Sequence, residues 1–516
     1  MPATVFFRVT GPPSWSERAN RPGRRRNQSM PPPIALLICS AFVLFLLRQE
    51  ARASQDVSKA TWIPTLWILM IASRSLGAWF GNTASNDSGN TYDPIALLSL
   101  SFMGIAVIAR RRFDWAGICR QHGWLVALLA YMFLSTLWSD ITLIALKRWI
   151  REVIVLIMAL VIASEADPRR ALASVMRRSA YVLLPFSLLL IKYYPLLGRA
   201  YGRWSGIEMW TGVTSQKNGL GRLCMISVFF LLFALYQRRR DPAADGGRHQ
   251  AWADIFVILL ALYLLNGADS STSLATLLLG VATFLGLVSF RRPKVPQVVL
   301  FAVVLFLMAF GASAPFLGGS NIAAFSSSLG RDSTLTGRTE VWAAVLPAEQ
   351  RQPLLGYGFG SFWTQARREL YEIPTAHNGY LDVLLELGAA GLTLFTVWML
   401  SCVRNLHRAF ALNYEWASLG ICLVLMGLIY NSTESALNTL TEEMTAVVVL
   451  TTIVAAYKPI FDQDSEANES LDACVPWGES LTTDYAGSDG FDGEWTPAKT
   501  FRNRNSVPDP ATIRFN

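Results

Sequence analysis

Long apolar stretches recur along this chain from Ile34 to Tyr457, and short polar loops separate them. Each stretch is long enough to cross a hydrocarbon core of roughly 30 Å. Because lipid offers the backbone no hydrogen-bonding partner, such stretches must form helices that pack together. The composition agrees, since 52% of the residues are hydrophobic and only 16% are charged. These values are typical of membrane proteins and exclude an ordinary soluble fold.

The sequence therefore predicts an all-α polytopic membrane protein with about 12 or 13 transmembrane helices and a large helical loop outside the membrane. A first helix bundle is expected over residues 34–316, an outer cap loop over 317–376, and C-terminal transmembrane helices over 377–457. The predicted spans are 34–47, 61–80, 94–109, 123–138, 149–164, 179–196, 219–236, 252–266, 272–290, 297–316, 377–403, 415–430 and 442–457.

Basic residues in the loops predict the orientation, because cytoplasmic loops retain Lys and Arg. The loops 81–93 and 431–441 carry no basic residue and are expected outside. With the predicted spans, successive loops alternate between the two sides of the membrane, and no additional span is needed. The basic runs on the cytoplasmic side are 110–112, 169–170, 177–178, 238–240, 291–294 and 404–408.

The N-terminal region contains one conflict. The basic run 18–26 and the basic loop 48–59 cannot both be cytoplasmic across a single helix. Either the first span is re-entrant, or translation begins at Met30. The second interpretation is preferred, and residues 1–33 are then an N-terminal extension.

The C-terminal region is polar and acidic, so residues 458–516 are expected to form a disordered cytoplasmic tail. Asp462 and Asp464 in this tail resemble the metal motif of nucleotide-sugar transferases. Their place in an acidic segment on the cytoplasmic side favours coincidence. No catalytic metal is therefore expected.

The outer segment from about 316 to 376 has more structure than a connector needs, which is typical of functional loops. A helix is expected from Thr336 through Val345, a Gly-rich turn over 353–360, and a second short helix over 362–371. This segment is expected to form a small cap over the outer face.

Several basic residues break the positive-inside pattern, and these favour an anionic ligand at the outer surface. A diphosphate fits, because Arg presents a planar pair of donors and Lys a point charge to phosphate oxygens. The alternative is attraction to lipid headgroups, or pairing with acids such as Glu208 and Asp332. One of the basic residues, Arg74, stands within an apolar span, where an arginine is costly unless it faces a cavity or extends to the interface. The basic residues are Arg74, Arg148, Lys217, Arg222, Arg331 and Arg338.

Of the four histidines, only His377 is predicted to face outward. It lies at the start of a helix expected from Asn378, and the partial positive charge there favours a neutral imidazole that can accept a proton. The alternative is a structural capping histidine. On the same helix Asn378, Asp382 and Glu386 repeat at i+4, and this polar stripe is expected to face the bundle interior.

Three ordered motifs resemble those of the O-antigen ligase and polymerase superfamily, over most of residues 60–457. Two departures are Gln216, where members often have His, and the lack of a basic residue near Ser271. The first motif comprises Thr336-Gly-Arg-Thr-Glu-Val-Trp342, Pro353-Leu-Leu-Gly-Tyr-Gly-Phe-Gly-Ser-Phe362, Ala376-His-Asn-Gly-Tyr-Leu381 and Leu387-Gly388; the second is Gly212-Val-Thr-Ser-Gln-Lys-Asn-Gly-Leu-Gly221, and the third is Ser270 to Leu274.

The resemblance implies a membrane glycosyltransferase, with a fold similar to other multi-helix enzymes that use lipid-linked sugars. It would move a glycan from a polyprenyl diphosphate carrier to a glycan or lipid-linked acceptor, in polymerisation or ligation. The site would face the periplasm or cell exterior from the bacterial inner membrane. Membrane lipid would be a further partner, and no cofactor, metal or nucleic acid is expected. The implied roles are catalysis for His377 and Arg338, diphosphate binding for Lys217, Arg222, Arg331, Arg148 and Arg74, and orientation of the glycans for Asn378, Asp382 and Glu340.

A transporter or flippase of lipid-linked sugars is the alternative, because the same basic cavity could move a substrate without cleaving it. Such proteins often contain inverted repeats and broken helices. No convincing internal repeat is found, and a helix-start histidine beside an outer cap favours chemistry. The sequence leaves open whether the enzyme is a ligase or a polymerase, and which sugar and acceptor it uses.

Overall fold

The structure is a computed structural model that describes residues 30–81, 92–111, 115–201, 206, 208–240, 248–289, 295–317, 338–371, 373, 375–437 and 439–456. Outside these residues lie the chain before Met30, the predicted tail 458–516 and Arg331, which is predicted to bind the diphosphate.

The described chain is built almost entirely of helices, as its composition predicts. The exception is an antiparallel hairpin in which β1 (Arg199–Tyr201) pairs with β2 (Glu208–Trp210). The helices are α2 (Pro32–Ala53), η1 (Lys59–Thr61), α3 (Trp62–Ile71), α4 (Leu76–Trp79), α5 (Tyr92–Ala109), α6 (Trp115–Gln121), α7 (Gly123–Ser135), η2 (Thr136–Trp138), α8 (Thr142–Ala163), α9 (Pro168–Tyr193), α10 (Pro195–Gly198), α11 (Lys217–Arg240), α12 (Arg248–Ala268), α13 (Ser271–Ser289), α14 (Gln297–Ser313), η3 (Ala314–Phe316), α16 (Arg338–Glu349), α17 (Gln365–Tyr371), α18 (Gly379–Ala409), α19 (Tyr414–Asn431) and α20 (Glu443–Ala456).

Within the described ranges, nine helices are long and apolar enough to cross a membrane, by their length and composition. Three shorter apolar helices lie at Lys59–Ile71, Gly123–Trp138 and Glu443–Ala455. α8 has 22 residues, but charged side chains interrupt its first half. Together these helices coincide with the predicted spans, so the prediction of an all-α, multi-pass membrane protein is confirmed.

The helices differ in how much of their surface the bundle covers. In the apolar part of α2 only 22% of the residues are buried, against 83% in α9. Large apolar side chains on the poorly covered helices are exposed, for example Leu37 on α2 (70%) and Phe102 on α5 (76%). Such exposure suits contact with lipid tails. Helices α2 and α5 therefore lie at the edge of the bundle and α9 near its centre.

Several predicted spans have different bounds in the structure, because an apolar run does not fix where a helix begins or ends; α9, for example, begins at Pro168 rather than at 179. α3 ends at Ile71 and α4 begins only at Leu76, so the prediction that Arg74 lies within a transmembrane span is wrong. The chain leaves the helix there because the amide of Arg74 donates to the carbonyl of Val213 (3.0 Å). α8 begins at Thr142 rather than at 149, which places the neighbouring basic residues within a helix.

Contacts between loops define two separate ends of the bundle. At one end Arg111 lies 2.7 Å from Glu165, and Arg170 lies 3.2 Å from Asp56. These residues belong to segments predicted to be cytoplasmic. At the other end, segments predicted to be external meet around Glu434. Which end faces the cytoplasm stays a prediction.

A kink divides α18 and receives the Gly-rich turn of the outer segment. Gly388 has a φ of 65° and a ψ of −169°, which breaks the helix. The freed backbone groups pair with the turn instead: the amide of Tyr357 donates to the carbonyl of Leu385 (3.0 Å), and the amide of Ala389 donates to the carbonyl of Pro353 (2.8 Å). These hydrogen bonds provide partners for backbone groups that the break in the helix leaves unpaired, and they hold the turn against α18.

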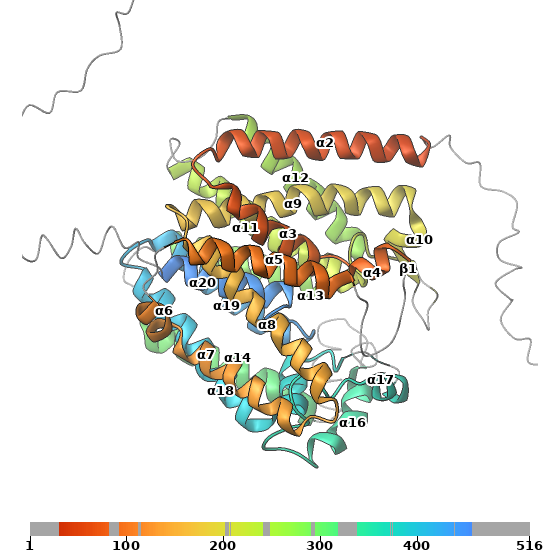
Figure 1. Cartoon of the computed structure of the whole chain (residues 1–516), viewed down its shortest axis with the longest axis vertical. Helices are drawn as coiled ribbons and strands as arrows, with labels where there is room; N and C mark the ends of the chain where they lie inside the picture. Colours follow the sequence, from red (N-terminus) through yellow and green to blue (C-terminus); the bar gives the residue numbers. More distant parts are fainter. Residues whose placement is uncertain are drawn as a thin grey trace, which may run out of the picture. The chain divides into compact units, whose positions relative to one another are not determined.

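The described part of the outer segment contains the helices α16 and α17, which Figure 1 shows together at one end of α18. α16 begins near the predicted position, whereas α17 begins at Gln365 rather than at 362. Between them the turn has positive φ at Gly356, Gly358 and Gly360 (64°, 91° and 63°), as the Gly-rich pattern predicts. A small apolar cluster that includes Trp342 packs the segment against the start of α18.

Candidate active site

His377 occupies a tight turn immediately before α18. Its φ is 51°, a left-handed conformation that is uncommon for residues other than glycine. The capping role belongs to Asn378, because its Oδ1 accepts hydrogen bonds from the amides of Tyr380 and Leu381, at 3.0 Å each. The imidazole of His377 is therefore not needed as a helix cap.

Neighbouring residues of the Ala-His-Asn-Gly motif hold this turn in place. Ala376 is fully buried, and its carbonyl accepts a hydrogen bond from Nε1 of Trp342 (2.9 Å). Gly379 must lack a side chain, since a Cβ there would lie 1.9 Å from Oδ1 of Asn431. The motif thus fixes the backbone that positions His377.

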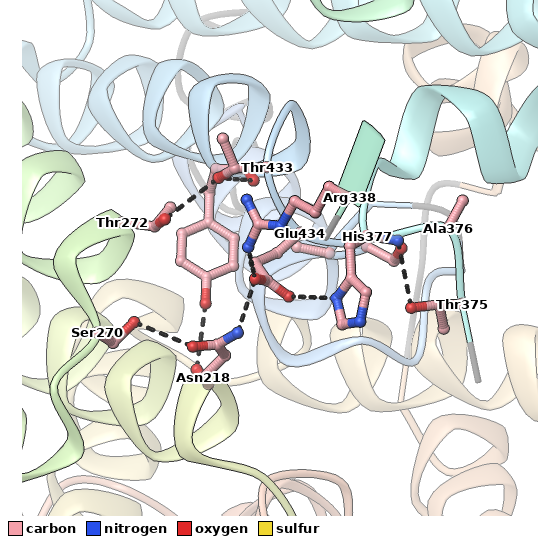
Figure 2. A network of polar contacts seen from close by, with 12 residues as sticks. Asn218, Ser270, Thr272, Arg338, Thr375, Ala376, His377, Thr433 and Glu434 are labelled. Atoms are coloured by element: carbon pink, nitrogen blue, oxygen red, sulfur yellow. Dashed lines mark hydrogen bonds and ion pairs between the residues drawn. The ribbon is translucent and has the colours of Figure 1, made fainter. Parts of the chain in front are cut away.

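Glu434, in the loop between α19 and α20, is the carboxylate around which the polar cluster is assembled (Figure 2). Its Oε2 lies 3.1 Å from Nδ1 of His377, and its Oε1 accepts a 2.6 Å hydrogen bond from Nδ2 of Asn218. Arg338, the first residue of α16, forms an ion pair with the same carboxylate. Glu434 is 8% exposed, whereas His377 is 26% exposed. Four segments far apart in the sequence therefore meet at one buried carboxylate.

The contact with Glu434 assigns a proton to one nitrogen of the imidazole. A carboxylate only accepts, so Nδ1 of His377 is the donor, and in the neutral imidazole Nε2 then has a free lone pair. Figure 2 shows the imidazole with Nδ1 toward Glu434. An imidazole held in this way can take a proton from a hydroxyl group at Nε2, which is the task of a general base.

Buried polar contacts hold the loop that carries Glu434. Asn431 is fully buried, and its Oδ1 accepts hydrogen bonds from the amides of Ala436 and Leu437 (3.1 and 2.9 Å). Further along the loop, the amide of Thr441 donates to Oε2 of a buried glutamate on α8 (3.1 Å). The position of the carboxylate is therefore set by its own loop as well as by its ligands.

The polar stripe on α18 faces the bundle interior, as predicted: Asn378 and Asp382 are fully buried, and Glu386 is 7% exposed. Asp382 accepts a hydrogen bond from Nε1 of Trp363 (2.8 Å), and Glu386 accepts one from the amide of Gly360 (2.9 Å). These contacts join α18 to the outer segment. The predicted role of the stripe in orienting glycans stays a prediction.

A polar cavity of about 230 Å³ opens beside His377 and Glu434. Arg222 lies in its wall and contacts two carboxylates, Glu442 at 2.7 Å and Glu443 at 3.4 Å. In the part of the chain that the structure describes, no group of three or more His, Cys, Asp or Glu residues is arranged to hold a metal ion. The other lining residues are Ile71, Ala72, Ser73, Thr214, Ser215, Gln216, Asn218, Gly219, Thr375, Tyr430, Ser435 and Thr441.

A second, apolar cavity of about 760 Å³ lies beside the polar one and shares Ser73 with it. Its walls come from α2, α3, α5 and α9, and include Leu66, Leu100 and Phe186. Leu66 is 45% exposed, so this cavity is accessible from the outside of the bundle. A polar site and an apolar cavity thus meet at the end of α3.

Three of the predicted basic residues lie close to the polar cavity. Lys217 is the first residue of α11 and is half-buried; no ion pair of its ammonium group is found with a described residue. Arg222 lies just over one turn further along α11, and Arg338 reaches Glu434 from α16. Sequence and structure therefore agree that these three residues belong to one region.

The other predicted residues have different surroundings. Arg74 donates to the carbonyls of Gly212 (3.1 Å) and Thr214 (2.9 Å), as well as to that of Leu197, so its guanidinium organises the segment before α11. Arg148 donates to the carbonyl of Gly360 in the Gly-rich turn. These contacts account for both guanidinium groups without a ligand. Glu340 is exposed in the first turn of α16 and does not line the cavity.

Sequence reasoning missed Glu434, Glu442 and Glu443 as site residues. All three lie in or beside an outer loop that the charge pattern identified only by its lack of basic residues. Asn218 stood within a quoted motif but was given no role. The one signal available in the sequence was a carboxylate, Glu434, in that short outer loop. The sequence could not show that this carboxylate contacts His377.

Comparisons with known proteins agree with the motifs. Residues 255–396 match the sequence model of the O-antigen ligase family, a segment that includes His377 but ends before Glu434. The chain is also 27% identical over 290 residues to the exopolysaccharide production protein ExoQ of Rhizobium meliloti (strain 1021), which covers 53% of this chain and 62% of that protein. The chain thus spans less than two thirds of the length of this relative. The resemblance to the superfamily is confirmed, and the match to the O-antigen ligase family extends over residues 255–396.

Proposed function

We propose that this chain is a membrane glycosyltransferase that moves a glycan from a polyprenyl diphosphate carrier to a hydroxyl group of an acceptor glycan. The observation that carries the proposal is the His377–Glu434 pair in the wall of a polar cavity, 3.1 Å apart. A histidine oriented by a carboxylate and open to a cavity is arranged for proton transfer. A protein that only translocated its substrate would not need this arrangement.

The proposed step begins with the acceptor hydroxyl at Nε2 of His377. Nε2 takes the proton while the acceptor oxygen forms a bond with the anomeric carbon of the donor glycan. The bond between that carbon and the diphosphate oxygen breaks, and the diphosphate leaves with the electron pair. Glu434 stabilises the imidazolium that forms, and Arg338 and Asn218 keep the carboxylate in place. Nucleotide, metal and cofactor have no part in this step.

The departing diphosphate gains negative charge, so it needs fixed cationic donors. Lys217 is the best candidate, because it begins a long helix beside the cavity and has no ion-pair partner among the described residues. Helix N-termini favour anions through their unpaired amides and dipole. Arg338 can assist from behind Glu434, since its partner Glu434 would carry less charge once an imidazolium proton is shared.

The carrier also needs an apolar site for its hydrocarbon chain. The 760 Å³ apolar cavity meets the polar one at Ser73, and it opens where the bundle surface is expected to face lipid. Part of a polyprenyl chain could therefore lie there while its diphosphate reaches Lys217.

The proposed product is an exopolysaccharide, as the name of the ExoQ relative suggests. The glycans of a deletion strain test this. Capped single repeat units would identify a polymerase, and accumulated full-length polymer on the lipid carrier would identify a ligase. In vitro, transfer from a purified polyprenyl diphosphate glycan by protein in detergent separates an enzyme from a flippase, because no second compartment exists there.

We further propose that the active site faces the periplasm or cell exterior of the bacterial inner membrane. A reporter fused after Gly330 should then behave as extracytoplasmic, and one fused after Lys458 as cytoplasmic. Both fusions on one side of the membrane would contradict this topology.

A further inference from the structure

The polar cavity is lined by more carboxyl groups than cationic side chains. Three of its lining residues are carboxylates, namely Glu434, Glu442 and Glu443, and among the described lining residues the one cation of fixed charge is Arg222. Arg338 compensates Glu434 from behind. Arg222 faces both remaining carboxyl groups, Glu442 at 2.7 Å and Glu443 at 3.4 Å.

Glu442 is the carboxylate of that pair that a ligand would meet. Its side chain is 35% exposed, whereas that of Glu443 is 6% exposed. Only Oε2 of Glu442 is held by Arg222. Its second oxygen has no hydrogen-bond donor among the described residues, so it can accept from a bound molecule.

The size of the cavity limits what this carboxylate can select. About 230 Å³ is smaller than the roughly 300–1,000 Å³ of typical pockets for drug-sized ligands, so the space suits one sugar ring rather than an oligosaccharide. The ring that enters must be the one whose hydroxyl group reaches Nε2 of His377. In the proposed reaction this is the acceptor sugar.

We propose that Glu442 makes the enzyme selective for the charge of its acceptor sugar. The carboxylate accepts hydrogen bonds from the hydroxyl or ammonium groups of a neutral or amino sugar, and it repels a sugar that carries a carboxylate of its own. Unpaired charge against the wrong ligand is a common basis of specificity. This inference rests on the proposed function, because that function assigns the acceptor to the cavity.

The two substrates are then assigned to surroundings of opposite charge. The donor diphosphate is assigned to Lys217 and Arg338, neither of which lines the cavity, and the acceptor ring to the carboxylates that do. The carboxylates that line the cavity also repel the diphosphate, so the position assigned to the acceptor stays free.

Binding of simple glycosides to the full-length protein in lipid nanodiscs tests this inference. The probes are the methyl glycosides of glucose, glucosamine and glucuronic acid, and saturation-transfer NMR measures their dissociation constants. We expect the wild-type protein to bind the glucoside and the glucosaminide at least about tenfold more tightly than the glucuronide. Glu442→Gln should reduce that ratio to near one, and Glu442→Asp should preserve its direction.

The matched control is Glu369→Gln, which removes an exposed carboxylate on α17 outside the cavity and should leave the ratio unchanged. If Glu442 only supports the fold, Glu442→Gln would weaken all three glycosides equally and the ratio would stay, which overturns the inference. Equal or tighter binding of the glucuronide by wild type, or no binding of any glycoside, would overturn it as well. Because binding needs no turnover, these outcomes are distinct from a failure of glycan transfer itself.

Discussion

The two ends of the helix bundle both contain buried charge clusters, but the clusters differ in how their charges are matched. At the end with the basic loops, Arg178 and Glu50 lie 2.6 Å apart and are 4% and 0% exposed. Arg177 and Asp254 form a similar pair, with exposures of 2% and 0%. At the other end, the histidine bound to Glu434 is 26% exposed and borders a cavity.

The difference agrees with a structural role for the first cluster and with the proposed catalytic role for the second. Arg178 also donates to Oγ1 of Thr61 (2.9 Å) and stacks on Trp62 (4.8 Å to the ring centroid), so its charge is enclosed on all sides. Removal of one partner from a buried pair of this kind strongly destabilises the protein, because the other charge is left uncompensated. Around Glu434 the three donors come from three other segments of the chain, and one of them, His377, has a second ring nitrogen that borders the cavity. Variants at the two ends should therefore fail in different ways.

The largest effect is expected for His377→Ala, which should slow glycan transfer by about 10²–10⁴-fold, because the acceptor proton then has no base. Donor binding should change little. His377→Gln should be similarly slow, since an amide can hydrogen-bond but cannot become a cation. Turnover of a purified polyprenyl diphosphate glycan provides the measurement.

The control for that variant is His249→Ala, which removes an exposed histidine at the start of α12 and should leave turnover unchanged. Wild-type turnover in the His377→Gln variant would mean that the imidazole positions a substrate without acting as a base.

At the opposite end, Arg178→Ala should destabilise the protein by about 3–5 kcal/mol, because it leaves the carboxylate of Glu50 buried without its cationic partner. Abundance in the membrane and thermal stability in detergent should both fall. Transfer per folded molecule should stay near the wild-type value. The comparison with Arg170→Ala is informative, since Arg170 is 47% exposed and its removal should cost no more than about 1 kcal/mol. A folded Arg178→Ala protein without activity would break the proposed division between the two ends.

Glu434→Gln should lower kcat by roughly 10- to 10²-fold with a smaller change in KM, because the amide no longer stabilises an imidazolium. The double variant His377→Ala/Glu434→Gln should be no slower than His377→Ala alone, since the carboxylate acts through the histidine. Additive losses would show that Glu434 has a separate role.

The smallest effect is expected for Lys217→Ala, which should raise KM for the donor by roughly tenfold, the loss of one charge-assisted hydrogen bond. The matched control is Lys192→Ala, an exposed lysine near the end of α9, which should have no such effect. If the KM for the donor is unchanged in Lys217→Ala, other residues bind the diphosphate.

The sequence alone determined the class of fold and the place of the motif that contains His377. Runs of apolar residues must become helices in lipid, because the backbone has no other hydrogen-bonding partner there. The Ala-His-Asn-Gly motif marked the turn before α18, since Asn378 is a strong helix cap and Gly379 permits the close approach of Asn431. Local chemistry of this kind acts between neighbours in the chain, so it can be read from the sequence.

Only the tertiary structure decided which charges meet. Asn218, Arg338, His377 and Glu434 are separated by up to 216 positions in the sequence, and their contacts depend on how α11, α16, α18 and the loop after α19 pack. The same packing gave the side chain of Arg74 four backbone carbonyls as partners, and Arg74 lies outside the apolar span in which the sequence had placed it. Charge and residue type predict that a partner is needed, but long-range geometry determines whether that partner is a ligand, a carboxylate or the backbone.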